Sequence, residues 1–171
     1  ADESEELLYV EPGLRPKRIS TFHSFGHRLL MENDNYKKIR ATRRLRKNFS
    51  LISNSDHLDV LAGDAGQLAG FTRADGVGAL RVKQSCSVNS ADAKIIAILK
   101  EYHKILEKLN AIDYDDQIEL TNKLLEIDSE VAKQARQAAA HLLVDEYQDI
   151  NEAQFRMIRL LAKGNECGVF V

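Results

Sequence analysis

Leu142-Leu143-Val144 is a short apolar run followed at once by two acids, Asp145 and Glu146, and it narrows the possible folds more than any other part of the sequence. An apolar run of this kind, with acids directly behind it, is typical of a buried strand in a parallel sheet. Ligands of open α/β sheets bind beyond the carboxyl ends of such strands, where both acids would lie. There one carboxylate can hold Mg²⁺ while the other orients or deprotonates a water molecule. Acids that simply occupy a strand-to-helix turn are the alternative explanation.

Helical spacing of apolar residues dominates the rest of the chain. Between Ile95 and Leu109 apolar residues recur every three or four positions, as they do on one face of a helix. Asp149 and Glu152 have the spacing of a capping box at the start of another helix. Further helices are expected over residues 21–32, 113–126 and 128–140, and strands over residues 17–21, 141–145 and 168–171. Glycines loosen the pattern between residues 54 and 89, where we expect short helices and loops. The predicted fold class is therefore α/β and mostly helical, with a small parallel sheet.

Composition excludes several classes of protein. No stretch approaches the roughly 20 apolar residues of a membrane span, and the acidic first residues exclude a secretory signal peptide for the sequence as given. The two cysteines, Cys86 and Cys167, lie far apart without a CxxC partner, which argues against a disulfide scaffold or a zinc site. A cytoplasmic location without membrane contact is expected.

Basic residues concentrate in one segment although the net charge is only −2. Residues 12–47 contain eleven Lys and Arg residues against two acids, which is a local charge of +9. Such a concentration indicates contact with a polyanion, and we regard Arg43, Arg44 and Arg46 as candidate phosphate contacts. A solvated charged helix is the alternative explanation.

Two other groups of polar residues allow a metal interpretation that we do not favour. Asp113, Asp115 and Asp116 fit the first turn of a helix, where the helix dipole favours acids. His23 and His27 have zinc-ligand spacing on a helix, but the sequence offers no evident third ligand.

Three blocks, in this order, resemble motifs of the UvrD/Rep family of superfamily 1 DNA helicases. The first block is similar to the family's DNA-contacting motif Ib, the second to the Asp-aromatic-Asp-Asp segment after its inserted helical domain, and the third to its Walker B segment. In this sequence they read Ile19-Ser20-Thr21-Phe22-His23-Ser24-Phe25, Asn110-Ala111-Ile112-Asp113-Tyr114-Asp115-Asp116 and Leu143-Val144-Asp145-Glu146-Tyr147-Gln148-Asp149-Ile150-Asn151-Glu152-Ala153-Gln154-Phe155.

The resemblance implies a role for several residues. Asp145 would bind Mg²⁺, directly or through water, and Glu146 would be the catalytic base for ATP hydrolysis. Gln148 and Asp149 would belong to the same nucleotide-binding motif. The residues that would lie along single-stranded DNA are Thr21, Phe22 and His23, and the free N–H groups of a helix N-terminus suit a phosphate there.

The resemblance also implies a division of the chain. Residues 1–33 and 113–171 would belong to a RecA-like motor domain with part of its parallel sheet, and residues 34–112 to an inserted helical subdomain. No GxxxxGK[ST] phosphate loop occurs in the sequence, so the chain is expected to be an internal piece that is inactive alone.

The implied activity is that of an ATP-dependent 3′–5′ DNA helicase in repair, replication or recombination. It would use ATP and Mg²⁺, and its partners would be single-stranded DNA and single/double-strand junctions. A nucleoid-associated location in the cytoplasm would follow. The alternatives are a non-catalytic module that binds nucleic acid or a partner, and the helicase part of a helicase–nuclease.

Overall fold

The computed structural model describes residues 19–85, 93–139, 141–164 and 169–170. Seven α-helices lie in this part of the chain: α1 (Phe22–Met31), α2 (Ser55–Leu68), α3 (Arg73–Gln84), α4 (Ala93–Leu109), α5 (Tyr114–Ile127), α6 (Ser129–Ala138) and α7 (Glu152–Ala162). Two 3-10 helices accompany them, η2 (Glu32–Lys37) and η4 (Tyr147–Asp149). The strands are β1 (Ser50–Ile52), β2 (Ala111–Asp113), β3 (Leu142–Leu143) and β4 (Val169–Phe170). The expected α/β, mostly helical class is confirmed.

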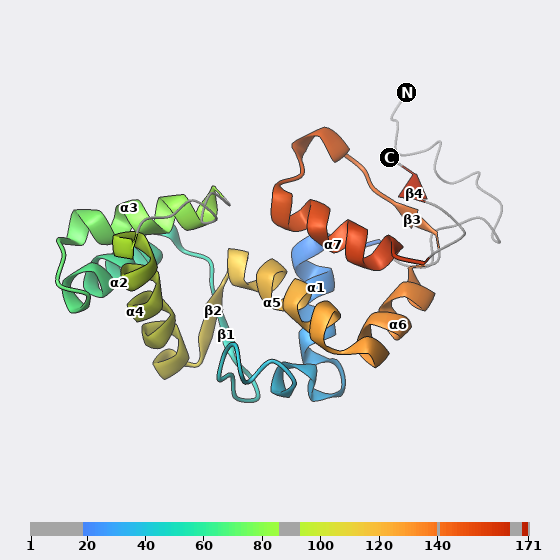
Figure 1. Cartoon of the computed structure of the whole chain (residues 1–171), viewed down its shortest axis with the longest axis horizontal. Helices are drawn as coiled ribbons and strands as arrows, with labels where there is room; N and C mark the ends of the chain where they lie inside the picture. Colours follow the sequence, from blue (N-terminus) through green and yellow to red (C-terminus); the bar gives the residue numbers. More distant parts are fainter. Residues whose placement is uncertain (1–18, 86–92, 140, 165–168, 171) are drawn as a thin grey trace, which may run out of the picture.

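The elements form two lobes, which Figure 1 shows side by side. One lobe contains α2, α3 and α4, and the other contains α1, α5, α6 and α7. The chain leaves the second of these lobes along β1 and returns along β2, and the two strands pair in parallel, with Ser50 opposite Ala111. The α2–α4 lobe, which we call the helical lobe, is therefore an insertion between two adjacent parallel strands.

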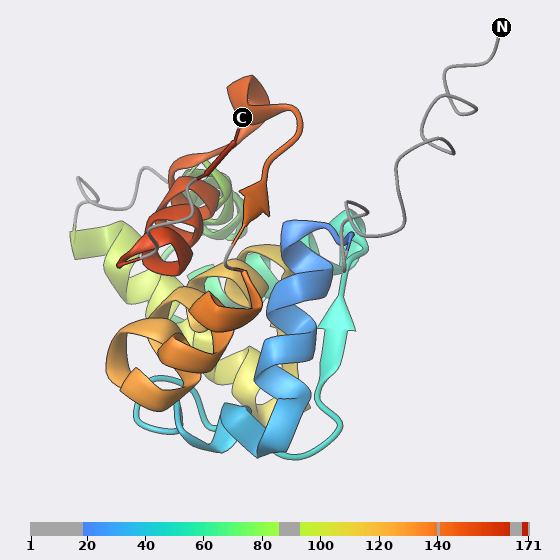
Figure 2. The same ribbon diagram turned by 90° about the vertical axis from the view of Figure 1, so that its right-hand side faces the viewer.

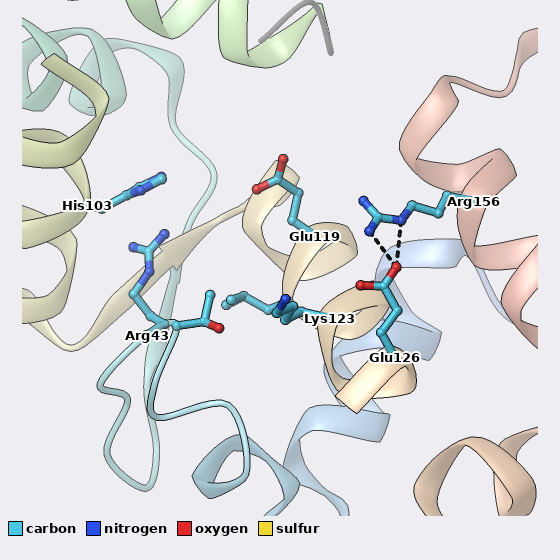
Figure 3. A pocket seen from close by; sticks show the side chains of 8 residues that line it. Arg43, His103, Glu119, Lys123, Glu126 and Arg156 are labelled. Carbon is cyan, nitrogen blue, oxygen red and sulfur yellow. Dashed lines mark hydrogen bonds and ion pairs between the residues drawn. The ribbon is translucent and has the colours of Figure 1, made fainter. Parts of the chain in front are cut away.

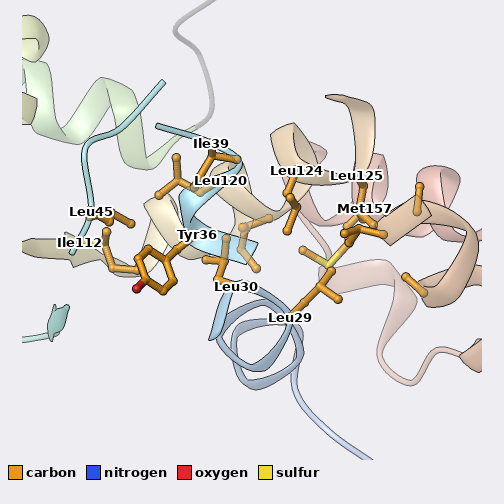
Figure 4. Packing of buried hydrophobic residues seen from close by; sticks show 14 of the residues in the cluster. Leu29, Leu30, Tyr36, Ile39, Leu45, Ile112, Leu120, Leu124, Leu125 and Met157 are labelled. Atoms are coloured by element: carbon orange, nitrogen blue, oxygen red, sulfur yellow. The ribbon is translucent and has the colours of Figure 1, made fainter. Parts of the chain in front are cut away.

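The larger hydrophobic core joins segments from both ends of the described chain. Figure 4 shows Leu29 and Leu30 of α1 packed with Leu124 of α5 and Met157 of α7. Tyr36, Ile39, Leu45 and Phe49 belong to the same core. The segment after α1 therefore packs with α1, α5 and α7 as far as about residue 50, later along the chain than the expected division at residue 34. The expected return near residue 113 coincides with β2. The assignment of domains stays a prediction.

The helical lobe has a hydrophobic core of its own, and its helices approach each other closely at glycines. Leu58, Leu80, Ile98 and Tyr102 are buried there. A Cβ atom at Gly76 of α3 would overlap the backbone oxygen of Ala62 in α2. The expectation of short helices and loops in this segment is therefore wrong, since α2 and α3 have 14 and 12 residues.

Helix boundaries follow from capping side chains. Thr21 accepts a hydrogen bond from the Ser24 N–H at the start of α1, and Asp128 does the same for Val131 at the start of α6. The expected capping box of Asp149 and Glu152 is wrong by two residues. Asn151 and Gln154 form the capping box of α7, because η4 occupies residues 147–149 first.

The expected strands are present only in part. β3 and β4 pair in parallel, with Leu142 opposite Val169, within the ranges 141–145 and 168–171 that the sequence indicates. The expected burial of this strand is wrong, because β3 has only two residues and Leu143 is 66% exposed. The strand expected over residues 17–21 is absent from its described part, where Ile19 is exposed and Thr21 caps α1. Positions 17 and 18 and the cysteines Cys86 and Cys167 lie outside the described residues. Within the part of the chain that the structure describes, no helix is long and apolar enough to cross a membrane.

Candidate nucleotide and nucleic-acid sites

The loop after β3 carries the two acids expected at a nucleotide site. Asp145 and Glu146 are both exposed, as are Gln148 and Asp149. The Asp145 carboxylate accepts a hydrogen bond from the Glu146 N–H at 2.8 Å, and the Gln148 amide donates to the Glu146 carboxylate. The structure thus brings Asp145, Glu146 and Gln148 together in one loop at the carboxyl end of a parallel strand.

Glu146 adopts an uncommon backbone conformation, with a φ of 51°. Left-handed backbone is disfavoured for residues other than glycine, and such residues cluster at functional sites. The turn is held by a hydrogen bond of 2.9 Å from the Asp149 N–H to the Glu146 carbonyl oxygen. An uncommon backbone conformation of this kind marks the loop as a candidate site.

The oxygen chemistry of Asp145 fits a magnesium ion. Mg²⁺ takes one or two carboxylates from the protein and completes its coordination with waters and substrate phosphates. The described residues contain no group of three His, Cys, Asp or Glu side chains placed to hold a metal ion by themselves. A phosphate-bound ion that contacts Asp145 directly or through water is compatible with this arrangement.

A second candidate site lies at the N-terminus of α1. Thr21 is exposed, and the His23 ring meets the Tyr114 ring edge-on, with 4.8 Å between the ring centroids. Burial lowers the pKa of His23, and the negative charge of Asp115 raises it by less, so the ring is neutral near pH 7. Phe22 is half-buried and packs against the larger core. We call Thr21, His23 and Tyr114 the α1–α5 surface.

Tyr114 is a residue of this surface that we did not derive from the sequence. Its side chain is 44% exposed although it is large and apolar, and it begins α5 directly after Asp113. The aromatic residue within the Asp-Tyr-Asp-Asp block was the available signal. An exposed aromatic ring beside a neutral histidine can stack on nucleic-acid bases.

The structure separates the three candidate arginines of the basic segment. Arg43 is only 3% exposed, and its Nη2 donates to Asp116 Oδ1 at 3.1 Å. Its guanidinium is thus engaged inside the protein, and we do not retain it as a phosphate contact. The segment is not the regular helix of the alternative explanation, because non-helical turns follow η2.

Arg44 and Arg46 remain exposed and share a surface hollow with Arg40. These three arginines and Leu45 line a cavity of about 340 Å³, which we call the arginine hollow. Two side chains fix the backbone of this segment, one from α4 and one from the residue between α4 and β2. The Arg44 N–H donates to Glu107 at 3.2 Å, and the Arg46 N–H donates to Asn110 at 2.8 Å. Three exposed arginine side chains on one surface suit a phosphate-rich ligand.

Comparison with known proteins identifies the family to which the chain is similar. Residues 71–171 match the family model described as UvrD/REP helicase N-terminal domain. The ATP-dependent DNA helicase Rep of Buchnera aphidicola (subsp. Schizaphis graminum) is 27% identical over 161 residues, covering 86% of this chain and 23% of the relative. The ATP-dependent DNA helicase PcrA of Bacillus subtilis is 29% identical over 166 residues, covering 89% and 22%.

A third relative is more similar over a shorter stretch. The ATP-dependent DNA helicase UvrD1 of Mycobacterium tuberculosis is 39% identical over 67 residues, covering 39% of this chain and 9% of the relative. The chain spans about a quarter of the length of the first relatives, or less. Because the family model matches more than half of its residues, the chain belongs to the UvrD/REP helicase N-terminal domain family.

Proposed function

We propose that this chain forms part of the first motor domain of an ATP-dependent DNA helicase that moves 3′ to 5′ along single-stranded DNA. The observation that carries the proposal is the exposed Asp145–Glu146 pair in a strained loop at the end of a parallel strand. Membership of the family and the names of the relatives support it. The activity would belong to a polypeptide of the relatives' length and serve repair, replication or recombination.

At the nucleotide side, the carboxylates have separate tasks. Asp145 would hold Mg²⁺, which neutralises charge on the phosphates of ATP. Glu146 would accept a proton from the attacking water, and its hydrogen bond with Gln148 would orient the carboxylate. Asp149 fixes the turn through its backbone N–H. The sequence has no GxxxxGK[ST] phosphate loop, so we expect the 171-residue chain alone not to turn over ATP.

At the DNA side, two surfaces would divide the work. The α1–α5 surface would meet bases and backbone through Thr21, His23 and Tyr114, whereas the arginine hollow would meet phosphates. Closing and opening of two motor domains would move the strand past Thr21–His23, and the helical lobe would guide duplex DNA toward the single/double-strand junction. A cytoplasmic, nucleoid-associated location goes with this proposal.

Replacing Arg44 and Arg46 with alanine is expected to make single-stranded DNA binding less sensitive to salt. Each phosphate contact contributes about 0.7 to the slope of log affinity against log salt, so the double variant should lose up to about 1.4. Binding should weaken similarly for unrelated sequences, because phosphate contacts carry no base information. The measurement is fluorescence anisotropy of labelled oligonucleotides at several salt concentrations with the full-length protein.

Lys133 and Lys163 provide the control, since both are exposed lysines of α6 and the end of α7. Their double replacement should leave the salt slope unchanged. An unchanged slope in the Arg44 and Arg46 variant would instead show that the arginine hollow does not contact phosphates. Arg43 is kept in both variants, because its removal would leave Asp116 buried without one of its cations.

A further inference from the structure

A buried cluster of charged side chains joins the helical lobe to the start of α5. Lys83 of α3 donates to both carboxylate oxygens of Asp113 at 2.8 Å and lies 3.1 Å from Asp116 Oδ1. The hydroxyl of Tyr102 in α4 donates to Asp113 at 2.9 Å, and Arg43 pairs with Asp116 at 3.1 Å. We call Lys83, Asp113, Asp116, Arg43 and Tyr102 the ion cluster.

The positive and negative charges of the buried ion cluster balance each other. Lys83, Asp113 and Asp116 are each at most 4% exposed, so two cations face two carboxylates away from water. Burial alone would lower the pKa of Lys83, but Asp116 and Asp113 raise it above its ordinary value. Burial alone would raise the pKa of Asp116, but Lys83 and Arg43 hold it below its ordinary value. Lys83 and Asp116 therefore remain charged at neutral pH.

The remaining polar neighbours of the cluster are neutral or lie outside it. Burial lowers the pKa of His103 to about 4, so this α4 residue is neutral near pH 7 despite the nearby Asp116. Burial raises the pKa of Asp115, which follows Tyr114 on α5. Burial likewise raises the pKa of Glu119, which Lys83 acts to lower. The positive charges within the ion cluster itself are those of Lys83 and Arg43.

The ion cluster fixes the backbone that presents Tyr114. Asp113 ends β2 and caps α5, accepting the Asp116 N–H at 2.8 Å while its carboxylate is held by Lys83. Tyr114 is the next residue, and its ring meets His23 of α1. The path from Lys83 to the α1–α5 surface therefore consists of one ion pair, one helix cap and one ring contact.

A cavity beside the ion cluster gives it room to rearrange. Figure 3 shows this cavity, of about 340 Å³, with Arg43, His103 and Lys123 on its wall. Arg43 Nη1 and Asp116 Oδ2 are buried without a hydrogen-bond partner among the described residues. The Arg43 guanidinium and the Asp116 carboxylate thus each keep a buried atom with which an alternative pairing can form.

We propose that Lys83 is a positioning residue through which the helical lobe sets the orientation of Tyr114 and His23. The inference rests on the proposed function, because it assigns these two residues to the DNA-facing surface. Movement of the helical lobe, for example when duplex DNA binds it, then changes the affinity of the α1–α5 surface for single-stranded DNA. Conversely, single-stranded DNA that stacks on Tyr114 stabilises the arrangement in which Lys83 of α3 pairs with Asp113, because coupling between two sites is reciprocal.

The absence of tryptophan from the sequence makes the test direct. In the 171-residue chain, Tyr114→Trp therefore introduces a single fluorescent reporter at the α1–α5 surface. The emission of this tryptophan and its quenching by iodide are measured well below the unfolding temperature. Adding Lys83→Met should raise the quenching and weaken single-stranded DNA binding by about threefold to thirtyfold, the usual range of coupling between sites. Lys83→Arg, which retains the cation, should restore both signals in part.

Lys94→Met is the matched control, because Lys94 pairs with Asp75 at 2.7 Å within the helical lobe. It should leave the emission, the quenching and the affinity unchanged. If Lys83→Met only lowers the unfolding temperature and leaves the reporter's signals in the folded protein unchanged, Lys83 is merely structural and the proposal is wrong. If Lys83→Met does not fold, Tyr102→Phe removes a single hydrogen bond to Asp113 and should change the quenching in the same direction, and no change there overturns the proposal.

The reporter also separates this proposal from the proposed function. A reporter that responds to Lys83→Met but not to oligonucleotide supports the positioning role and contradicts a DNA-facing Tyr114. A reporter that responds to oligonucleotide but not to Lys83→Met supports the DNA surface and contradicts the positioning role.

Discussion

Replacing Gly76 with alanine is expected to lower the free energy of unfolding by about 3 kcal/mol or more. The added Cβ would overlap the Ala62 backbone oxygen and lie 2.7 Å from the Ala62 carbonyl carbon. Because the obstacle is backbone within a helix, no side chain can rotate away, and α2 and α3 must separate. Urea unfolding followed by far-UV circular dichroism measures the loss.

Gly78 supplies a control on the same helix. A Cβ there meets nothing within 4 Å, so Gly78→Ala adds helix propensity without a clash and should raise stability by about 0.5–1 kcal/mol. Opposite signs at positions 76 and 78 are therefore expected. Equal stability of the two variants would contradict the close approach of α3 to α2, which belong to the lobe that lies behind α1 and α5–α7 in Figure 2.

Replacing Glu146 with glutamine is expected to reduce ATP turnover of the full-length protein by at least about a hundredfold, the scale on which a general base contributes. Glutamine keeps the size and hydrogen-bonding capacity of the side chain but cannot accept the proton of the attacking water. Nucleotide binding should persist, because Asp145, the proposed magnesium ligand, is unchanged. Steady-state hydrolysis and equilibrium binding of a labelled nucleotide separate the two effects.

Glu152 is the matched control, since it is an exposed acid in the first turn of α7, close after the same loop. Glu152→Gln should hydrolyse ATP at nearly the rate of the unsubstituted protein. Near-normal turnover in Glu146→Gln would remove Glu146 from the role of base, and a loss of nucleotide binding would assign it to the binding of the metal ion instead.

Local signals in the sequence predicted the helices that pack through one apolar face. The spacing from Ile95 to Leu109 indicated α4, and Leu99, Tyr102 and Leu106 of that series are buried. Helices were expected to begin at about residues 21 and 128, and in the structure Thr21 and Asp128 are the N-caps of α1 and α6. Local chemistry suffices where each element carries its own pattern.

Long-range pairing and close helix contacts escaped prediction. β1 and β2 are three residues each, and they pair across the whole helical lobe, so neither run reads as a strand by itself. The glycines of α2 and α3 suggested loops, yet Gly76 lies at a helix contact where a side chain would not fit. A glycine selected for close approach and a glycine selected for flexibility look alike in one sequence.

The candidate sites show the same division. The exposed place of Asp145 and Glu146 beyond β3 was predictable because both acids follow an apolar run in the sequence. The separation of buried Arg43 from exposed Arg44 and Arg46 was not, because it depends on Asp116, far along the chain. The acids Asp113 and Asp116 were expected near a helix start, and their pairing with Lys83 became visible only in three dimensions.

The measurement that tests the helicase account most directly is stimulation of ATP hydrolysis by single-stranded DNA in the full-length protein. Tyr114→Ala should raise the oligonucleotide concentration for half-maximal stimulation by about tenfold, within the range that stacking of one base contributes. Phe71→Ala, which removes an exposed aromatic residue of the helical lobe, should leave that concentration unchanged. Hydrolysis that single-stranded DNA does not stimulate, or equal half-maximal concentrations in the two variants, would contradict a motor that grips DNA at the α1–α5 surface.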